Sequence, residues 1–328
     1  MSLKNAANQA KHAAADDALL PDKLQAGAAA ALGLAAFLFY KYILEYYYGG
    51  DPHWYQIYYD SLMSQDLLGA LTSQSKFLGS SEVIYPVIAW LGSRAGIDRN
   101  TLMAAFDGVF YFFIASYLIR EKCSPLFVAL TLTNFYLVVL CTSAERLKFS
   151  YLFLVFALFA SGRLRFAWVA LSPLAHFQNI ITISSLIIYN FLGNLSLKVK
   201  IVMAVISSLG AGAIVFLFSD ALSSKFASYS GRGDVFDAIP AGMVLIVSLF
   251  VFKNKSLSFF SLLPLVMLSA ILGGERVNMI VFTIFYYIVL SEKKTRNPVV
   301  LVMMGYFSFK TIGYIQNVFS FGDGFAAG

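Results

Sequence analysis

The sequence predicts an all-α polytopic membrane protein. Of its 328 residues, 59% are hydrophobic and only 13% are charged, and the mean hydropathy is +0.72. Long apolar runs recur along the chain, a pattern that a water-soluble globule does not show. The net charge of +6 is explained by basic residues that mark cytoplasmic loops. We therefore expect the lipid bilayer as a partner and exclude nucleic acid.

Eleven apolar runs predict about eleven membrane spans. They cover residues 24–44, 101–119, 124–142, 147–161, 165–178, 179–193, 199–219, 239–252, 256–273, 277–291 and 298–317. We expect one transmembrane domain over 24–317, between a cytoplasmic N-terminal tail (1–23) and a short C-terminal tail (318–328). The run 83–92 is short and contains Pro86, so it predicts a helix lying in the membrane interface.

Charge placement predicts the orientation of these spans. With residues 83–92 outside the membrane, most Lys and Arg residues fall on one side, and most Asp and Glu residues fall on the other. Since cytoplasmic loops are enriched in Lys and Arg, the N-terminus is expected in the cytoplasm. Residues 45–100 and 220–238 are then outer loops. A twelfth span at 83–92 would place Arg120, Lys122, Arg163 and Arg165 outside, and we reject it.

Three charged residues stand at the outer start of the span 147–161, within the segment TSAERLKFSY. Glu145 has two interpretations: it completes a capping box with Thr142, or it belongs to a functional site. Arg146 is harder to explain, because a cation in the first turn of a helix opposes the helix dipole. A bound anion would reverse that cost, since the helix N-terminus and the guanidinium would both face it. Lys148 adds a further positive charge.

A second Glu-Arg pair, Glu275 and Arg276, opens the span 277–291 behind two glycines. The repetition predicts one anion site built from two helix N-termini and two arginines. The alternative is that chance or interfacial snorkelling places each pair separately.

His176 lies at the outer end of the fifth span, in the segment SPLAHFQN, which also contains Gln178. It is either a packed, hydrogen-bonded histidine or a functional one, and the predicted topology puts it at the depth of Arg146 and Arg276. No His, Cys or carboxylate pair has metal-ligand spacing, so we predict no metal site.

Two outer segments complete the set of candidates. Residues 46–71 contain a Gly-Gly-Asp-Pro turn and then a helical pattern with Trp54, Tyr58 and Leu62 on one face. This predicts an amphipathic helix in the aromatic belt of the membrane, although aromatic faces and carboxylates also bind sugars. In the second segment, 224–239, Arg232 is a third candidate anion contact or a solvated loop residue.

Four of these features together resemble the EpsG-like branch of the Wzy-type polysaccharide polymerases. They are a G-x-D-x-x-x-Y loop (Gly49, Asp51, Tyr55), a glutamate before the helix EVIYPVI, Arg146 opening the fourth span and His176 ending the fifth. The likeness covers residues from about 45 to 290. The family often has Arg-Gln where this chain has Arg146-Leu147. The long outer loop with its interfacial helix is also similar to GT-C glycosyltransferases.

The resemblance implies polymerisation of O-antigen, capsular polysaccharide or exopolysaccharide at the periplasmic face of the bacterial inner membrane. Repeat units would be carried on undecaprenyl diphosphate, no cofactor would be needed, and a chain-length regulator and a flippase are implied partners. His176 would be the general base, with Asp51 or Glu145 as substitutes. The implied substrate-binding residues are Arg146, Arg276, Lys148, Arg232, Glu275, His53, Trp54, Tyr55 and Gln178.

Two other classes remain open from the residues alone. A transporter or flippase would move the same lipid-linked sugars or another anion, and an O-antigen ligase or acyltransferase would use the same lipid carrier. Asp107 and Lys310 lie inside predicted spans. Each alone favours a bundle-facing polar contact, whereas a pair of them across helices would favour transport.

Overall fold

The computed structural model describes residues 23–192, 238–272 and 274–325, with side chains left out for 187–192 and 270–276. The predicted span 199–219, the predicted loop residues 220–237 and the tail residues 1–22 lie outside the described residues. All secondary structure in the described ranges is helical, and no strand occurs in them.

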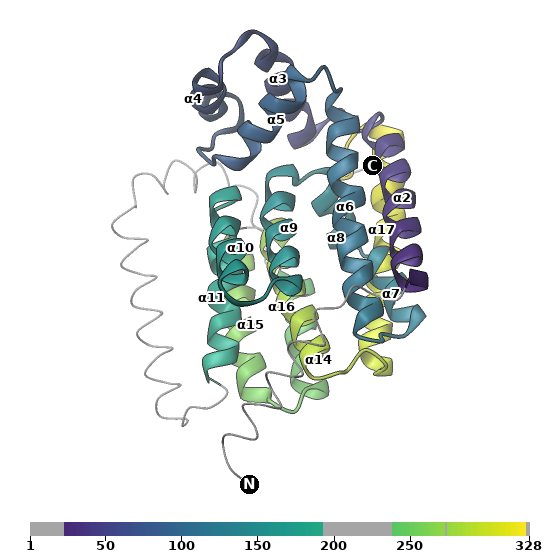
Figure 1. The fold of residues 1–328 in the computed structure, drawn as a ribbon. Coiled ribbons are helices and arrows are strands. Elements are labelled where there is room, and N and C mark those ends of the chain that lie inside the picture. The colour runs from purple at the N-terminus through teal and green to yellow at the C-terminus, as the bar shows by residue number, and fades with distance from the viewer. Residues whose placement is uncertain (1–22, 193–237, 273, 326–328) are drawn as a thin grey trace, which may run out of the picture. The chain divides into compact units, whose positions relative to one another are not determined.

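Nine helices begin and end close to the predicted runs. They are α2 (Lys23–Leu44), α6 (Arg99–Arg120), α9 (Glu145–Phe159), α10 (Gly162–Ala175), α11 (Asn179–Leu192), α14 (Ile239–Val251), α15 (Lys255–Leu272), α16 (Gly274–Ser291) and α17 (Pro298–Phe321). These helices confirm the all-α prediction for the described residues (Figure 1).

The predicted run 124–142 is broken into α7 (Pro125–Leu132) and α8 (Phe135–Thr142). Asn134, which is fully buried, causes the break: its side-chain oxygen accepts a hydrogen bond from the backbone N–H of Tyr136 at 3.0 Å. An asparagine that bonds to the backbone in this way competes with the continuous helix ladder and starts a new helix. The predicted span at 124–142 is present as a helical segment of sufficient length, Pro125–Thr142, with a local break at Asn134.

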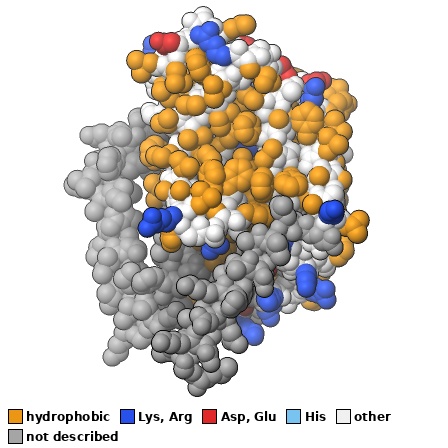
Figure 2. Space-filling view, in the orientation of Figure 1, with side chains coloured by type: hydrophobic (Ala, Val, Ile, Leu, Met, Phe, Trp, Pro, Cys, Tyr) orange, Lys and Arg blue, Asp and Glu red, His pale blue; other side chains and the backbone are white. Residues whose placement is uncertain are grey.

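Four helical segments of the described chain are long and apolar enough to cross a membrane: Lys23–Leu44, Arg99–Arg120, Pro125–Thr142 and Pro298–Phe321. Large apolar side chains on their outer faces point away from the protein, among them Leu34 and Leu38 of α2 and Val302 and Phe309 of α17. Hydrophobic side chains also cover much of the described surface in Figure 2, where charged ones are sparse. These are the features of an α-helical membrane protein.

The chain divides into two compact units by its internal contacts. Unit 1 comprises residues 1–128, 141–176 and 314–328, and unit 2 comprises 129–140 and 177–313. In unit 2, α15 packs against α11, α14 and α16, and Tyr136, Phe282 and Phe307 form an aromatic cluster. Lys310 stacks on the ring of Phe135, 4.2 Å from its centroid. The domain boundaries predicted at residues 23 and 317 stay predictions.

In unit 1, α2 packs along α6 at a point where both helices carry a glycine. A Cβ atom on Gly33 would lie 2.8 Å from the carbonyl oxygen of Gly108, and a Cβ on Gly108 would lie 3.0 Å from the carbonyl oxygen of Gly33. Small residues allow this close backbone approach, which is a common device in membrane helix pairs. Near the same interface, the hydroxyls of Tyr40 and Tyr111 are hydrogen-bonded at 2.5 Å.

Substitution of Gly33 by alanine is expected to lower the stability of the protein by about 1–3 kcal/mol, because the added methyl group forces the two backbones apart. The matched control is Gly27→Ala in the same helix, where a Cβ would meet nothing within 4 Å. Thermal unfolding in detergent measures both variants. Equal midpoints for Gly33→Ala and Gly27→Ala would contradict the close-packing argument.

The first outer segment folds as three short helices, α3 (Gly50–Ser61), α4 (Leu67–Leu78) and α5 (Ile84–Arg94), with a 3₁₀ turn, η1 (Leu62–Ser64), after α3. They gather beyond the ends of α6 and α9 (Figure 1). The helix expected after the Gly-Gly-Asp-Pro turn is present as α3, but it ends well before residue 71, because Asp66 starts a new helix by accepting a hydrogen bond from the N–H of Gly69 at 2.7 Å. The short helix expected at 83–92 is present as α5.

The buried face of α3 differs from the predicted one. Tyr58 and Leu62 are fully buried, but Trp54 is 52% exposed. The buried stripe follows Tyr55, Tyr58 and Leu62, which are spaced by three and four residues as a helix face requires. These side chains join a core with Tyr85 of α5 and Phe149 of α9, so the outer segment rests directly on the start of α9.

Candidate functional site

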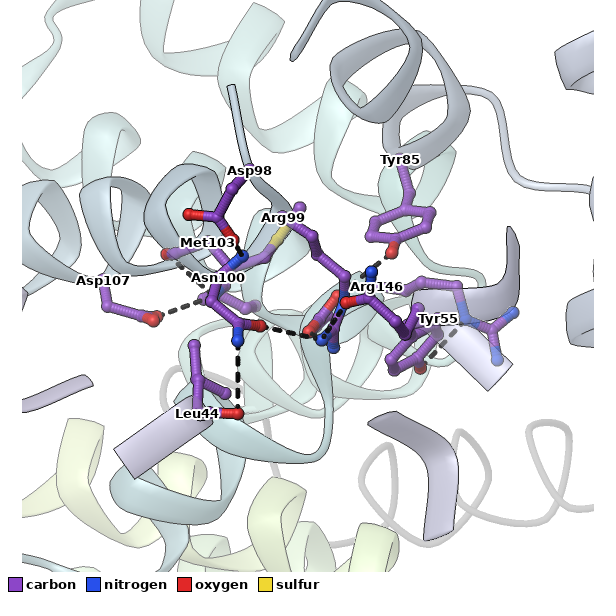
Figure 3. A network of polar contacts seen from close by, with 12 residues as sticks. Leu44, Tyr55, Tyr85, Asp98, Arg99, Asn100, Met103, Asp107 and Arg146 are labelled. Carbon is purple, nitrogen blue, oxygen red and sulfur yellow. Dashed lines mark hydrogen bonds and ion pairs between the residues drawn. The ribbon is translucent and has the colours of Figure 1, made fainter. Parts of the chain in front are cut away.

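The first turn of α9 carries Glu145, Arg146 and Lys148, and each of them is paired with a charged residue from another part of unit 1. The partners come from the start of α6, from the middle of α6 and from the stretch between α4 and α5. These contacts explain how three charges are held at the start of an apolar helix. Figure 3 shows part of this network, to which α6 contributes Arg99 and Asp107, α5 contributes Tyr85 and α9 contributes Arg146.

Glu145 forms an ion pair with Arg99, which is the first residue of α6, and accepts a hydrogen bond from the hydroxyl of Tyr85 at 3.0 Å. Its side chain is fully buried. The capping-box interpretation was wrong: the residue before α9 is Ala144, which makes no side-chain cap. Thr142 instead ends α8, and its hydroxyl is hydrogen-bonded to that of Tyr314 at 2.6 Å.

Lys148 lies deeper in the same unit. Its Nζ atom is 2.7 Å from a carboxylate oxygen of Asp107, and neither side chain is exposed. The same Nζ donates to the backbone carbonyl of Met103 at 3.3 Å. This pair links α9 to the middle of α6. Removing two charges from solvent is costly, so the pair is stable only because each charge neutralises the other.

Arg146 makes the third ion pair, with Glu82. Its Nη1 donates to Oε2 of Glu82 at 2.9 Å, and its Nε donates to the hydroxyl of Tyr55 at 3.3 Å. Oε1 of the same carboxylate is 2.6 Å from Nδ1 of His176, the residue that ends α10. Glu82 therefore bridges the arginine and the histidine that the sequence singled out, and Tyr55 completes the group.

This cluster differs from the other two ion pairs in its accessibility. The side chains of Arg146, Glu82 and His176 are 10%, 4% and 12% exposed, whereas those of Glu145, Lys148 and Asp107 are fully buried. Of the three ion pairs described for α9, the one between Arg146 and Glu82 is the most exposed, although both of its side chains are largely buried.

Glu82 is kept ionised by the donors around it. Burial raises the pKa of its carboxyl, but the hydrogen bond from His176 and the charge of Arg146 outweigh burial and lower the pKa to about 2. Gln74, which is fully buried, also donates to Oε2 of Glu82, at 3.3 Å. An ionised carboxylate accepts only, so these contacts require N–H donors from Gln74, Arg146 and His176.

The depressed pKa of Glu82 predicts acid sensitivity. The folded-state pKa of about 2 lies below the ordinary value of 4.5, so this group contributes stability above about pH 5 and loses it as the pH falls toward 2. Glu82→Gln should remove this contribution and flatten the acid limb of the stability curve. Thermal midpoints of both proteins between about pH 2 and 6 measure the difference. Parallel curves would contradict the prediction.

The structure places the other predicted site residues as follows. Asp51 lies in the first turn of α3, and His53 and Trp54 are exposed on that helix, with their rings edge to face at 5.4 Å. Gln178 lies in the turn that connects α10 to α11. The backbone of α16 begins at Gly274, so Glu275 and Arg276 occupy its first turn, but their side chains are outside the described residues. Arg232 is outside them entirely, and the shared two-arginine site stays a prediction.

Sequence reasoning missed most of the partners. Glu82 was noted only as part of a family pattern, and Arg99, Tyr85 and Gln74 were not singled out. A signal existed for Glu82 and Arg99, because each is a charged residue at the start of an apolar helix: Glu82 lies just before α5, and Arg99 is the first residue of α6. Among the described residues, no group of three or more His, Cys, Asp or Glu side chains is arranged to hold a metal ion.

The fold and the cluster define an α-helical membrane protein with a slightly exposed Arg–Glu–His group beneath its first outer segment. No protein-family model matches the chain, and no characterised protein or solved structure matches it either.

Proposed function

We propose that this protein is a membrane glycosyltransferase that polymerises bacterial surface polysaccharide from repeat units linked to undecaprenyl diphosphate. The observation that carries the proposal is the bridge made by Glu82, which holds a guanidinium and an imidazole on one carboxylate. A reaction that expels a diphosphate and deprotonates a hydroxyl needs a cation and a base side by side. The family resemblance of the four short motifs adds support.

Arg146 is the diphosphate-binding residue in this proposal. Guanidinium groups form paired, charge-assisted hydrogen bonds with phosphate oxygens, and these bonds are stronger at a partly desolvated position. The position in the first turn of α9 adds the positive end of the helix dipole. As the glycosidic bond to the carrier breaks, the leaving diphosphate gains negative charge, and Arg146 stabilises that charge.

His176 is the general base. Since ionised Glu82 only accepts hydrogen bonds, neutral His176 carries its proton on Nδ1, and the lone pair for catalysis is on Nε2. Nε2 takes the proton of the acceptor hydroxyl, and the hydroxyl oxygen bonds to the anomeric carbon of the growing chain. The bond from that carbon to the diphosphate oxygen breaks, and undecaprenyl diphosphate leaves with the electron pair.

The outer segment supplies the sugar contacts. Tyr55 touches Arg146 from the buried face of α3, and His53 and Trp54 lie exposed on the same helix. Aromatic rings of this kind stack on sugar faces. Asp51, at the start of α3, would accept hydrogen bonds from sugar hydroxyls.

Glu145 and Lys148 have structural roles in this proposal. Both are fully buried and ion-paired, so neither reaches a substrate hydroxyl or phosphate. We assign them to holding the first turn of α9, and therefore Arg146, in place.

The proposed setting is the bacterial inner membrane, with about eleven spans, a cytoplasmic N-terminus and the cluster facing the periplasm. The excess of Lys and Arg in the predicted cytoplasmic loops supports this orientation. A flippase would supply the lipid-linked units, and a chain-length regulator would act on the product.

A transporter is the second candidate, and the buried Asp107–Lys148 pair favours it, since ionisable pairs inside helical bundles occur along transport routes. The sequence suggests Lys310 as a candidate partner of Asp107. In the structure, Asp107 instead pairs with Lys148. The pair is sealed within unit 1, which favours a structural role.

The test is a reconstituted assay with the purified protein, undecaprenyl-diphosphate-linked repeat units from the host strain and EDTA. A ladder of lengthening glycans is expected. Movement of the lipid-linked unit between leaflets of a vesicle, with no ladder, would overturn the polymerase in favour of the transporter. Transfer of a single finished glycan to a different acceptor lipid would indicate a ligase.

A further inference from the structure

The carboxylate of Glu82 occupies a place beside Nη1 of Arg146 where a ligand anion would contact the guanidinium. It receives donors from Arg146 at 2.9 Å, His176 at 2.6 Å and Gln74 at 3.3 Å. These donors come from α9, from the end of α10 and from α4. Converging donors from three elements form a site for an oxyanion, and in this structure the occupant belongs to the chain itself.

Glu82 is also placed where it can move. It lies in the non-helical stretch 79–83 between α4 and α5, whereas Arg146 and Gln74 are fixed on helices and His176 ends one. Gly79 ends α4 with a left-handed backbone (φ +59°), so the stretch leaves the helix at a sharp turn. Its neighbour Ser81 is exposed. Displacement of Glu82 therefore needs no helix to unfold.

Electrostatics requires competition between Glu82 and any ligand anion. A phosphate that approached Arg146 with Glu82 in place would lie within a few ångströms of a like charge, at a site with little solvent to screen it. Arg146 can bind either Glu82 or a ligand anion strongly, but it binds both weakly when both are present. Its affinity for a ligand is thus reduced by the fraction of molecules in which Glu82 holds it.

We propose that Glu82 is an internal plug of the anion site and that a phosphate or diphosphate group binds Arg146 by displacing the Glu82 carboxylate from it. This inference rests on the proposed function for the identity of the anion. It adds that Glu82 blocks the anion site when no ligand is bound. Binding of the diphosphate group of the lipid carrier displaces Glu82 from Arg146. The contact between Glu82 and His176 persists on Oε1 while Oε2 releases Arg146.

The first experiment titrates inorganic diphosphate into the full-length protein in detergent, with no sugar present, by isothermal calorimetry. Glu82→Gln is expected to lower the Kd by about 10-fold or more, since it removes the competing charge but keeps the size of the side chain. Turnover should fall in the same variant, because His176 loses its orienting carboxylate. Tighter binding with slower turnover is a result that a merely structural Glu82 would not produce.

The matched control is Glu121→Gln, the same change at an exposed position after the end of α6, which should leave the Kd unchanged. A Glu82→Gln protein that melts like wild type and binds diphosphate no more tightly would overturn the plug. Repeating the titration with geranyl diphosphate separates the two sources of the anion. If Glu82→Gln binds both ligands more tightly than wild type, the plug is supported. A larger increase in affinity for geranyl diphosphate than for inorganic diphosphate identifies a lipid carrier as the source of the anion.

A second measurement does not depend on the folding of the Glu82 variant. A nitroxide label is attached at Ser81→Cys in a Cys123→Ser background, where the remaining Cys141 is fully buried. Saturating diphosphate should change the mobility of the label, because stretch 79–83 shifts when Oε2 of Glu82 releases Arg146. An unchanged spectrum would overturn the plug.

Failure of the plug and failure of the proposed function give different results. If Arg146→Ala loses diphosphate binding but Glu82→Gln changes nothing, the plug alone is wrong. If Arg146→Ala binds diphosphate as wild type does, the anion binds elsewhere, and both proposals are wrong.

Discussion

Replacement of Arg146 by alanine is expected to lower the rate of glycan elongation by about 10²- to 10³-fold, the usual effect of removing one donor that stabilises developing negative charge. Arg146 is the most exposed of the cations paired around the first turn of α9 and the one held beside a candidate base. The loss should appear mainly in kcat, because the charge on the leaving diphosphate grows in the transition state. Initial rates from reconstituted vesicles with lipid-linked repeat units measure it.

Two variants sharpen this test. Arg146→Lys keeps the charge but loses the planar fork, so it should recover only part of the rate. Arg163→Ala, at an exposed position near the start of α10, removes an arginine away from the cluster and should leave the rate unchanged. Wild-type product length and yield from Arg146→Ala would remove Arg146 from the reaction.

Breaking the ion pair between Asp107 and Lys148 should cost about 3–5 kcal/mol of stability, because either single substitution leaves an uncompensated charge in a fully buried place. Asp107→Leu and Lys148→Met are the single variants. The double variant replaces both charges by apolar groups and should regain most of the loss, since the desolvation cost of both ions disappears. Unfolding in mixed micelles, followed by circular dichroism, measures all three.

This cycle also separates the two functional candidates. If the pair is structural, the double variant elongates glycans near the wild-type rate and folds well. If the protein is a transporter that uses the pair, the double variant folds but transports nothing. Additive single-site losses would show that the two charges do not interact, in conflict with their 2.7 Å separation.

The predicted helices were found because hydrophobicity is a local property. Each apolar run is long enough to prefer one conformation, and nine helices lie close to the predicted runs. The helices depart from the predicted runs where a single polar side chain redirects the backbone. Asn134 divides α7 from α8, and Asp66 starts α4, through hydrogen bonds that composition alone does not reveal.

The candidate site was predicted in part for a comparable reason. A cation in the first turn of a helix has a local electrostatic cost, so Arg146 could be recognised as unusual from its position alone. Its compensating partner is Glu82, 64 residues away in the chain, and His176 is 94 residues from that glutamate. Pairing over such separations depends on which helix ends meet.

Composition and periodicity alone thus defined an all-helical membrane chain, the approximate ends of its helices and the charged residues that need an explanation. These follow from the affinity of each segment for water or lipid, which nearby residues decide. Tertiary structure alone decided that Glu145 and Lys148 are fully buried while Arg146 keeps some exposure. Accessibility is set by how α3–α5 and α6 cover the first turn of α9, and one carboxylate between Arg146 and His176 is a product of that packing.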